Sequence, residues 1–344
     1  MKTIRLSPLF SLLLCTSCFF NYEYPDMLDV YISPEVINLN DLNSPYDDYN
    51  IDQYQYYNNH LLVFSSNRNS QGEDFDLVTG GLSVEVDLEH GSYAITVNSV
   101  DFDNDEYGRI KELADFTNSP CDVLGPQLLT GVYRDDNYDY FSWTSLFYAD
   151  NCDNQFDIKW IAMEQSKPMK SVSVNQLNTS ADDLYPTIVG DSLIYFCSNR
   201  NGSFDIFSYG FNDKLYSDRM EQLAESLTKD TLNTVVYQSA LSSDGDDKCP
   251  HYVSTYENTY MIFASNRSGG FGGFDLYYSV WSNGVWQQPV NFGPEINSTS
   301  DEYRPVIVPV EGLENNLMLF SSNRPGGKGG FDLYYTGVML GPMF

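Results

Sequence analysis

Acidic residues with the spacing of a calcium-binding loop occur in the stretch DFDNDEYGRIKE, which begins at position 101. Asp101, Asp103, Asp105 and Glu112 take the first, third, fifth and twelfth positions of an EF-hand-like loop, and calcium prefers hard oxygen ligands of this kind. Glu106 stands where the turn of such a loop requires glycine, and the flanks are more typical of strands than of helices. Calcium binding is thus one hypothesis and a plain acidic loop the other. A calorimetric titration without saturable heat would exclude calcium.

Glycines surround a lysine in RPGGKGGFDLYY, from Arg324 to Tyr335, which is the composition of a phosphate-binding loop. Such a loop needs a serine or threonine directly after the lysine, followed by a helix. Lys328 is followed instead by glycine and then by another strand-like segment. We therefore expect a hairpin turn, in which glycine adopts positive φ without steric cost.

The same stretch recurs along the chain. Copies begin at Leu62, Ile194, Met261 and Leu317, and a worn copy begins at Leu146. Each copy follows an element of the type Asp-x-x-x-Pro, in which Ile51 replaces the proline of the first element; the aspartates are Asp47, Asp122, Asp182, Asp246 and Asp301. The other repeated polar residues are Asn67, Arg68, Asp76, Asp157, Asn199, Arg200, Asp205, Asn266, Arg267, Asp275, Asn323, Arg324 and Asp332.

The repeat predicts four strands. An apolar run follows the proline, a second strand ends at Ser-Asn-Arg, a turn rich in Gly, Asn and Ser follows, and a third strand starts at Phe-Asp; GVWQQPVNFG exemplifies the fourth. This is the pattern of a β-propeller blade, and 27 Tyr and 21 Phe suit pleated surfaces. We expect an all-β, single, five-bladed propeller, with blades that start near 47, 122, 182, 246 and 301. Six blades remain the alternative if residues 79–115 form another.

The last repeat leaves no room for its own fourth strand. DVYISPEVIN, residues 29–38, resembles PVNFGPEIN, the fourth strand and exit of the preceding repeat. We therefore predict that Asp29 to Asn38 closes the ring as the outer strand of the blade formed by residues 300–340. Closure would remove the exposed edges that an open array carries.

The repeated Ser-Asn-Arg, Gly-Gly and Phe-Asp-Leu/Ile-Tyr elements resemble the WD-like propeller repeats of TolB-type periplasmic proteins. They are most similar to the SNRPGGxGGFDLYY-type repeats of outer-membrane proteins, some of which join a propeller to an OmpA-like domain. The resemblance spans roughly residues 29–340 and implies the fold, whereas propellers carry many activities. No OmpA-like domain follows in this sequence.

Antiparallel strands bring the start of the first strand near the end of the second. We therefore expect Asp301 to accept hydrogen bonds from Arg324. The corresponding pairs are Asp47 with Arg68, Asp182 with Arg200, and Asp246 with Arg267. Because the pairs recur in successive repeats, we interpret them as structural. The aspartates of the Phe-Asp elements are predicted to bind turn amides.

Little in the sequence indicates catalysis. Five-bladed glycosidases need two carboxylates at the central funnel, and Asp52 is the one carboxylate expected there. His60, His90 and His251 have no recognisable nucleophile context and no zinc-like spacing. One helix is expected at residues 218–229, with Asp218 as its cap and a partner-docking role as one alternative to simple packing.

The first 18 residues, MKTIRLSPLFSLLLCTSC, resemble a bacterial lipoprotein signal, with residues 1–17 as the leader and Cys18 as the lipidated residue. Cys15 departs from the usual box, so an ordinary secretory leader is the alternative. Residues 18–28 would be a tether and 29–344 the propeller. Cys121, Cys152, Cys197 and Cys249 remain, and an oxidising compartment allows them to pair in ways that the sequence leaves open.

The net charge of −30 excludes nucleic acid as a favourable partner, because its recognition relies on basic groups. We expect no cofactor apart from the possible calcium. The leading interpretation is a non-catalytic, lipid-anchored platform for envelope protein partners at the bacterial outer membrane, on its periplasmic or its outer side. A carbohydrate-binding lipoprotein that stacks sugars on Trp143, Trp281 or Trp286 is the alternative, and a glycoside hydrolase is a more remote one.

Overall fold

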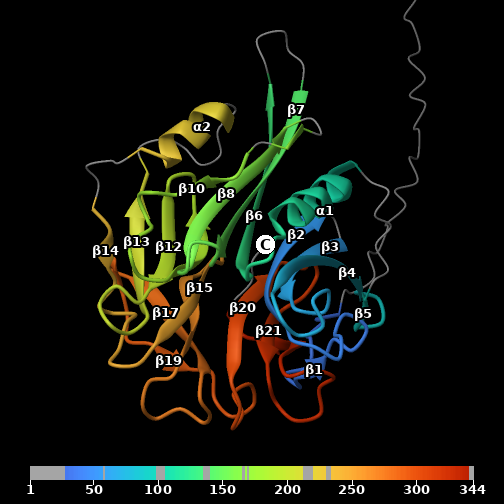
Figure 1. The fold of residues 1–344 in the computed structure, drawn as a ribbon. Coiled ribbons are helices and arrows are strands. Elements are labelled where there is room, and N and C mark those ends of the chain that lie inside the picture. Colours follow the sequence, from blue (N-terminus) through green and yellow to red (C-terminus); the bar gives the residue numbers. More distant parts are fainter. Residues whose placement is uncertain are drawn as a thin grey trace, which may run out of the picture.

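The computed structural model describes residues 28–56, 59–97, 105–134, 140–164, 167–168, 170–211, 220–229 and 234–340, and these form a ring of five antiparallel sheets (Figure 1). The five-bladed, all-β propeller predicted from the repeats is confirmed. Segment 79–97 belongs to the first blade and segment 105–117 is a helix, so no sixth blade forms there.

From its inner to its outer strand, the first blade holds β2 (Asp48–Tyr56), β3 (Asn59–Ser66), β4 (Asp76–Asp87) and β5 (Ser92–Val97). The second holds β6 (Val123–Arg134), β7 (Tyr140–Asp150), β8 (Asp157–Glu164) and β10 (Val172–Ser173), and β9 (Lys167–Pro168) also pairs with β8. The third holds β11 (Asp183–Val189), β12 (Leu193–Ser198), β13 (Asp205–Gly210) and β14 (Val236–Tyr237).

The fourth blade holds β15 (Asp247–Ser254), β16 (Thr259–Ser265), β17 (Asp275–Ser282) and β18 (Val285–Trp286), and β19 (Val290–Asn291) also pairs with β17. The fifth holds β20 (Glu302–Val308), β21 (Asn316–Ser322), β22 (Asp332–Val338) and β1 (Ile37–Asn38). Strands β2, β6, β11, β15 and β20 contact one another around the axis of the ring.

An N-terminal strand closes the ring, as predicted, but only Ile37 and Asn38 of the predicted segment 29–38 form that strand. In β1, Ile37 lies opposite Tyr335 and Asn38 opposite Tyr334, in antiparallel register with β22. Residues on both sides of β1 pack into the apolar core between the fifth and first blades: Ile32 before the strand, and Leu39 and Leu42 after it. The first and last strands of the ring therefore belong to one sheet.

Every inner strand carries a β-bulge near its start, directly after the second residue that follows the repeated aspartate. The bulged residues have positive φ, and they are Asn50, Gly125, Tyr185, Cys249 and Arg304. Left-handed backbone costs a residue with a β-carbon roughly 1–2 kcal/mol. Because four of these five residues carry a β-carbon, the ring must impose this conformation through its packing.

Two helices cover the seams between blades, and Figure 1 shows both toward the end of the ring from which the β6–β7 hairpin projects. The helix α1 (Asp105–Thr117) was missed by the sequence analysis, although Tyr107, Ile110 and Leu113 follow helical spacing and are buried. The helix α2 (Met220–Leu227) lies within the predicted segment 218–229 and buries Leu223 and Leu227 between the second and third blades. The predicted cap, Asp218, lies outside the described residues.

Neither of these helices has the length and apolar character needed to cross a membrane, within the part of the chain that the structure describes.

Candidate functional site

The phenylalanine of each Phe-Asp element docks onto the next blade in the same way around the ring. Its backbone N–H donates to the repeated aspartate of that blade, as in Phe331 to Asp47 at 2.7 Å and Phe274 to Asp301 at 2.9 Å. The phenylalanine carbonyl accepts a hydrogen bond from the backbone N–H of the residue that follows this aspartate. The other pairs are Phe75 with Asp122, Phe156 with Asp182, and Phe204 with Asp246. The repeated aspartates therefore join neighbouring blades.

The predicted pairs of these aspartates with arginines are wrong by one residue. Arg324 donates to Glu302 at 2.9 Å and Arg200 to Asp183 at 2.6 Å, not to Asp301 and Asp182. Likewise Arg68 pairs with Asp48 and Arg267 with Asp247. Adjacent residues point to opposite sides of an extended chain, so only the second acidic residue faces the arginine. The repeated aspartate pairs instead with the repeated asparagine. In the fifth blade, for example, the Asp301 N–H donates to Asn323 Oδ1 at 2.8 Å.

The aspartates of the Phe-Asp elements behave differently from blade to blade. Asp275 accepts from the backbone N–H groups of Phe271 and Gly272, and Asp332 accepts from those of Lys328 and Gly329. These are the turn amides of the fourth and fifth blades.

The other three aspartates of the Phe-Asp elements are Asp76, Asp157 and Asp205. Asp76 accepts a hydrogen bond from the side chain of Asn69. Burial raises the pKa of Asp157 and of Asp205.

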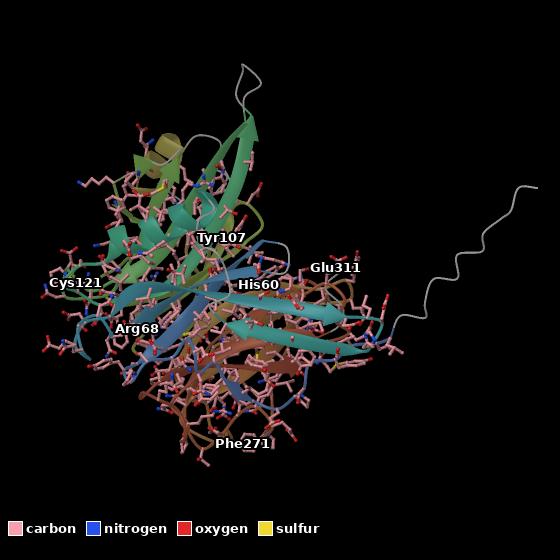
Figure 2. The ribbon with its side chains drawn as sticks, turned by 90° about the vertical axis from the view of Figure 1, so that its right-hand side faces the viewer. His60, Arg68, Tyr107, Cys121, Phe271 and Glu311 are labelled. Carbon is pink, nitrogen blue, oxygen red and sulfur yellow. A yellow bond between two sulfur atoms is a disulfide. The ribbon has the colours of Figure 1, made fainter. Side chains whose placement is uncertain are left out.

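The turns that carry Phe75, Phe274 and Phe331 surround a cavity of about 390 Å³ on the axis of the ring, the mouth cavity. It lies at the end of the blades that carries the turns between second and third strands. In Figure 2 this end is marked by Arg68, which follows the second strand of the first blade and lies on the opposite side of the view from Glu311. Its lining residues are Asp47, Tyr49, Phe75, Tyr185, Lys248, Phe274, Asp301, Tyr303 and Phe331.

Aromatic rings form a continuous arc in the mouth cavity. The Tyr49 ring lies 4.9 Å from Phe75 and 5.5 Å from Phe331, centroid to centroid. Tyr303 lies 5.8 Å from Phe331 and 4.6 Å from Phe274. All five residues are half-buried and line the cavity. Burial also raises the pKa of both tyrosines, which keeps their hydroxyl groups neutral.

Lys248 extends the arc on its other side. Its Nζ lies 4.0 Å from the ring centroid of Phe204 and 5.4 Å from that of Phe274, a cation–π arrangement. Among the described residues no carboxylate lies within ion-pair distance of this ammonium group. Asp47 uses its Oδ1 for Phe331, and its Oδ2 accepts no hydrogen bond from the described residues. The cavity thus offers one free donor group and one free acceptor atom among aromatic rings.

Side chains close the axis beneath the mouth cavity. Tyr185, 6% exposed, accepts a hydrogen bond of 3.4 Å from Asn50 Nδ2, and the Arg304 guanidinium lies 6.0 Å from its ring. Arg304 is 1% exposed and donates to the carbonyls of Pro126 at 2.7 Å and Ile51 at 3.4 Å. One arginine therefore binds two other blades at the centre of the ring and contacts a third.

Asp52, the carboxylate expected at the funnel, is not among the residues that line the mouth cavity. It is 3% exposed, and its Oδ2 accepts hydrogen bonds from Leu128 N–H at 2.6 Å and Gln127 Nε2 at 3.2 Å. Burial raises the pKa of Asp52 to about 6, although the nearby Arg304 guanidinium opposes this shift. The carboxylates at the mouth are Asp47 and Asp301 instead.

The histidines are no better placed for acid–base chemistry at neutral pH. Burial lowers the pKa of His60 to about 4, and burial together with Arg304 lowers that of His251 to about 3. His251 Nε2 accepts the N–H of Ile307, and His90 is an exposed partner of Asp87.

No group of acidic, histidine or cysteine side chains suitable for a metal occurs among the described residues. Of the proposed calcium ligands, Asp101 and Asp103 lie outside those residues, whereas Asp105 and Glu112 belong to α1. The helix replaces the strand-like flanks expected there. Cys18 also lies outside the described residues.

Cys121 and Cys152 form a disulfide, whereas Cys197 and Cys249 are buried free thiols. In the worn repeat, Cys152 stands where the other blades have the arginine of Ser-Asn-Arg. Val123 stands where they have its acidic partner. The disulfide therefore takes the place of the ion pair in the second blade.

The tryptophans proposed as sugar platforms are mostly unavailable. Trp143 and Trp286 are 2% and 6% exposed, and Trp286 donates to the Tyr195 hydroxyl of the neighbouring blade. Only Trp281 is exposed, on the outer part of the fourth blade.

The aromatic lining of the mouth was missed as a site. Its signal is in the sequence: a phenylalanine precedes the aspartate in all five copies, and the second residue after each Asp-x-x-x-Pro aspartate is Tyr49, Leu124, Leu184, Lys248 or Tyr303. As turn structure, this recurrence does not indicate by itself that the rings meet in one cavity.

No protein-family model and no curated protein sequence matches the chain. Solved structures share its ring. The catalytic domain of a family 62 α-L-arabinofuranosidase from Coprinopsis cinerea is 11% identical, with a TM-score of 0.51 over 92% of this chain and 98% of that one. An α-L-arabinofuranosidase from Podospora anserina, in complex with cellotriose, is 11% identical, with a TM-score of 0.50 over 91% and 98%.

A third similar structure is longer than this chain. A family 43 glycoside hydrolase protein from Bacillus licheniformis is 12% identical, with a TM-score of 0.47 over 88% of this chain. The chain spans about half of that protein's length, 54%. At these identities the likeness shows the fold alone.

The sequence-based prediction of a non-catalytic protein-interaction platform is contradicted by these comparisons. Two solved chains that share the ring, with TM-scores of 0.51 and 0.50, are α-L-arabinofuranosidases, and the prediction that the chain is not an enzyme is contradicted by the same finding. The resemblance to TolB-type repeats stays a prediction. Any activity of this chain has to be argued from its own residues.

Proposed function

We propose that the protein binds carbohydrate in the mouth cavity. A sugar ring presents apolar C–H faces and a rim of hydroxyl groups. Sites for such ligands combine aromatic surface with a few precisely placed polar groups. The observation that carries the proposal is the convergence of five aromatic rings with Lys248 and Asp47 in one cavity.

Two polar groups of the cavity suit the hydroxyl groups of a sugar. Among the described residues Lys248 Nζ has no ion-pair partner and Asp47 Oδ2 accepts no hydrogen bond, so Lys248 can donate to a sugar hydroxyl and Asp47 can accept from one. Hydrogen bonds to charged groups are the stronger kind, at about 1.5–3 kcal/mol each. The rings supply contact area with little loss of side-chain entropy, because the inter-blade hydrogen bonds already hold the phenylalanine turns.

Glycan arrays with the purified propeller test this proposal. The array carries arabinan, arabinoxylan, xylan and cello-oligosaccharides, chosen because of the names of the structurally similar enzymes, together with bacterial polysaccharides. We expect saturable binding to at least one glycan. Binding should weaken about tenfold in Tyr303→Ala and in Phe331→Ala, because each loses stacking worth on the order of 1 kcal/mol or more.

Phe271→Ala is the matched control, because Phe271 is a 46% exposed aromatic residue of the neighbouring turn that does not line the cavity. Equal loss in the control would contradict the proposal, as would the absence of binding to every glycan. Reducing-sugar release is measured in the same samples, because Asp47 and Asp301 line the cavity and glycosidic hydrolysis uses two carboxylates.

We also propose that the chain is exported and anchored through a lipid on Cys18. The support is the lipoprotein-like leader in the sequence. The Cys121–Cys152 disulfide adds support, because structural disulfides persist in oxidising compartments.

A further inference from the structure

The mouth cavity has an opening at one end of the axis and a floor at the other. Tyr185 forms the floor, and Asn50 and Arg304 fill the axis beneath it with 0% and 1% exposure. The hydrogen bonds of Arg304 to Ile51 and Pro126 hold this floor to the first and second blades. A ligand therefore has no passage through the ring.

The sides of the cavity are equally closed. Phe75, Phe274 and Phe331 come from turns that are joined to the next blade by two hydrogen bonds each, one to the aspartate side chain and one between backbones. Gly272 and Gly329 allow the closest approach. A β-carbon on them would lie 1.9 Å from the Ser300 carbonyl oxygen and 1.8 Å from that of Tyr46. The neighbouring blades therefore have little freedom to separate and open the cavity into a groove.

The volume sets the size of the ligand. At about 390 Å³ the cavity is near the lower limit of small-molecule pockets, which span roughly 300–1,000 Å³. An internal sugar of a polymer is extended by glycosidic bonds in two directions. A terminal sugar is extended in one direction only and can enter along the axis with its chain leaving through the opening.

We infer that the mouth cavity recognises the terminal unit of a glycan chain and not an internal segment. This inference rests on the proposed carbohydrate binding and narrows it to chain ends. Lys248 and Asp47 would then bind hydroxyl groups of the terminal sugar, which are free of glycosidic bonds.

Partial hydrolysis of a polysaccharide raises the number of chain ends while the mass of glycan stays the same, and this difference tests the inference. The probe is the polysaccharide with the strongest array signal, used intact and after partial acid hydrolysis to shorter chains of the same composition. We expect the amount of protein bound per mass of glycan to rise in proportion to the number of chain ends. An excess of the constituent monosaccharide should compete.

A matched pair of lysine variants tests the polar contacts. Lys248→Gln is expected to weaken competition by the monosaccharide about tenfold, a loss of about 1.4 kcal/mol. Lys328→Gln serves as the control, because the Lys328 ammonium is exposed and donates to the carbonyls of Asn40 and Asn43. Equal weakening in both variants would overturn the role of Lys248.

The outcomes separate the inference from the proposed function. Equal binding per mass before and after hydrolysis, without competition by the monosaccharide, would overturn chain-end recognition and leave carbohydrate binding intact. Absence of binding to any glycan on the array would overturn both.

Discussion

At the scale of single residues, Asp52 shows how burial changes the chemistry of a carboxyl group. The side chain is almost inaccessible, and its pKa rises from 3.8 to about 6 because the charged form loses its hydration. Two donors, Leu128 N–H and Gln127 Nε2, satisfy Oδ2 in place of water. The carboxyl group of Asp52 therefore stays neutral up to about pH 6 in the folded protein.

This raised pKa predicts a pH dependence of stability. The folded state holds the Asp52 proton up to about pH 6 and the unfolded state releases it near pH 4, so this contribution is complete below pH 4 and is lost as the pH rises to 6. Asp52→Asn keeps an acceptor oxygen but does not titrate. We expect the stability of the variant relative to wild type to increase between pH 4 and 6.5, by on the order of 3 kcal/mol.

Thermal unfolding of both proteins across this pH range measures the effect. Asp244→Asn, which removes an exposed carboxylate, is the control and should follow wild type. Parallel curves for Asp52→Asn and wild type would show that Asp52 titrates normally in the folded protein.

At the scale of elements, the second blade departs from its repeat and compensates for the departure. It lacks the arginine–acid ion pair of the other blades, and Lys159 binds Asp150 at 2.7 Å while a disulfide joins Cys121 to Cys152. A disulfide that closes a loop of this length, with a sequence separation of 31 residues, limits the unfolded chain by about 3–4 kcal/mol in the loop-entropy account.

We therefore expect reduction to lower the stability of the wild-type protein by about 3 kcal/mol. A Cys121→Ser/Cys152→Ser double variant should be equally destabilised without reductant and should not respond to it. Urea unfolding with and without reductant measures both proteins. A double variant as stable as the oxidised wild type would mean that the ion pair of Lys159 is sufficient for this blade.

At the scale of the whole molecule, the ring and its proposed anchor lie close together in the sequence. The described chain starts at Leu28, whose N–H donates to the Leu88 carbonyl of the first blade, and β1 then closes the ring at Ile37–Asn38. Only the residues between Cys18 and Leu28 would separate a lipid from the propeller.

Metabolic labelling with palmitate, in a bacterial host that expresses the full chain, tests the proposed anchor. Wild type should incorporate label and fractionate with membranes, whereas Cys18→Ala should lose the label. Cys15→Ala is the control, because Cys15 would be removed with the leader. Label retained in Cys18→Ala and lost in Cys15→Ala would place the lipid elsewhere.

Repetition is what allowed the sequence alone to determine the fold. Recurring Asp-x-x-x-Pro, Ser-Asn-Arg and Phe-Asp elements defined five blades, and the likeness of residues 29–38 to the end of the fourth blade predicted the closing strand. These features are local or periodic, so each can be recognised without knowing what lies beside it. The helix α1 also had a local signal, its spacing of buried residues, which the acidic loop pattern obscured.

Only the tertiary structure decided which side chains meet. Arg324 binds Glu302 and not Asp301 because strand register turns one of two adjacent residues outward. The aromatic mouth brings together Tyr49 and Phe331, from opposite ends of the chain, through closure of the ring. The position of the Lys248 ammonium over the Phe204 ring and the floor at Tyr185 depend equally on contacts between blades. A sequence pattern reveals the repeat that forms each blade. The mouth cavity forms only when the blades surround a common axis, because its lining residues come from several blades.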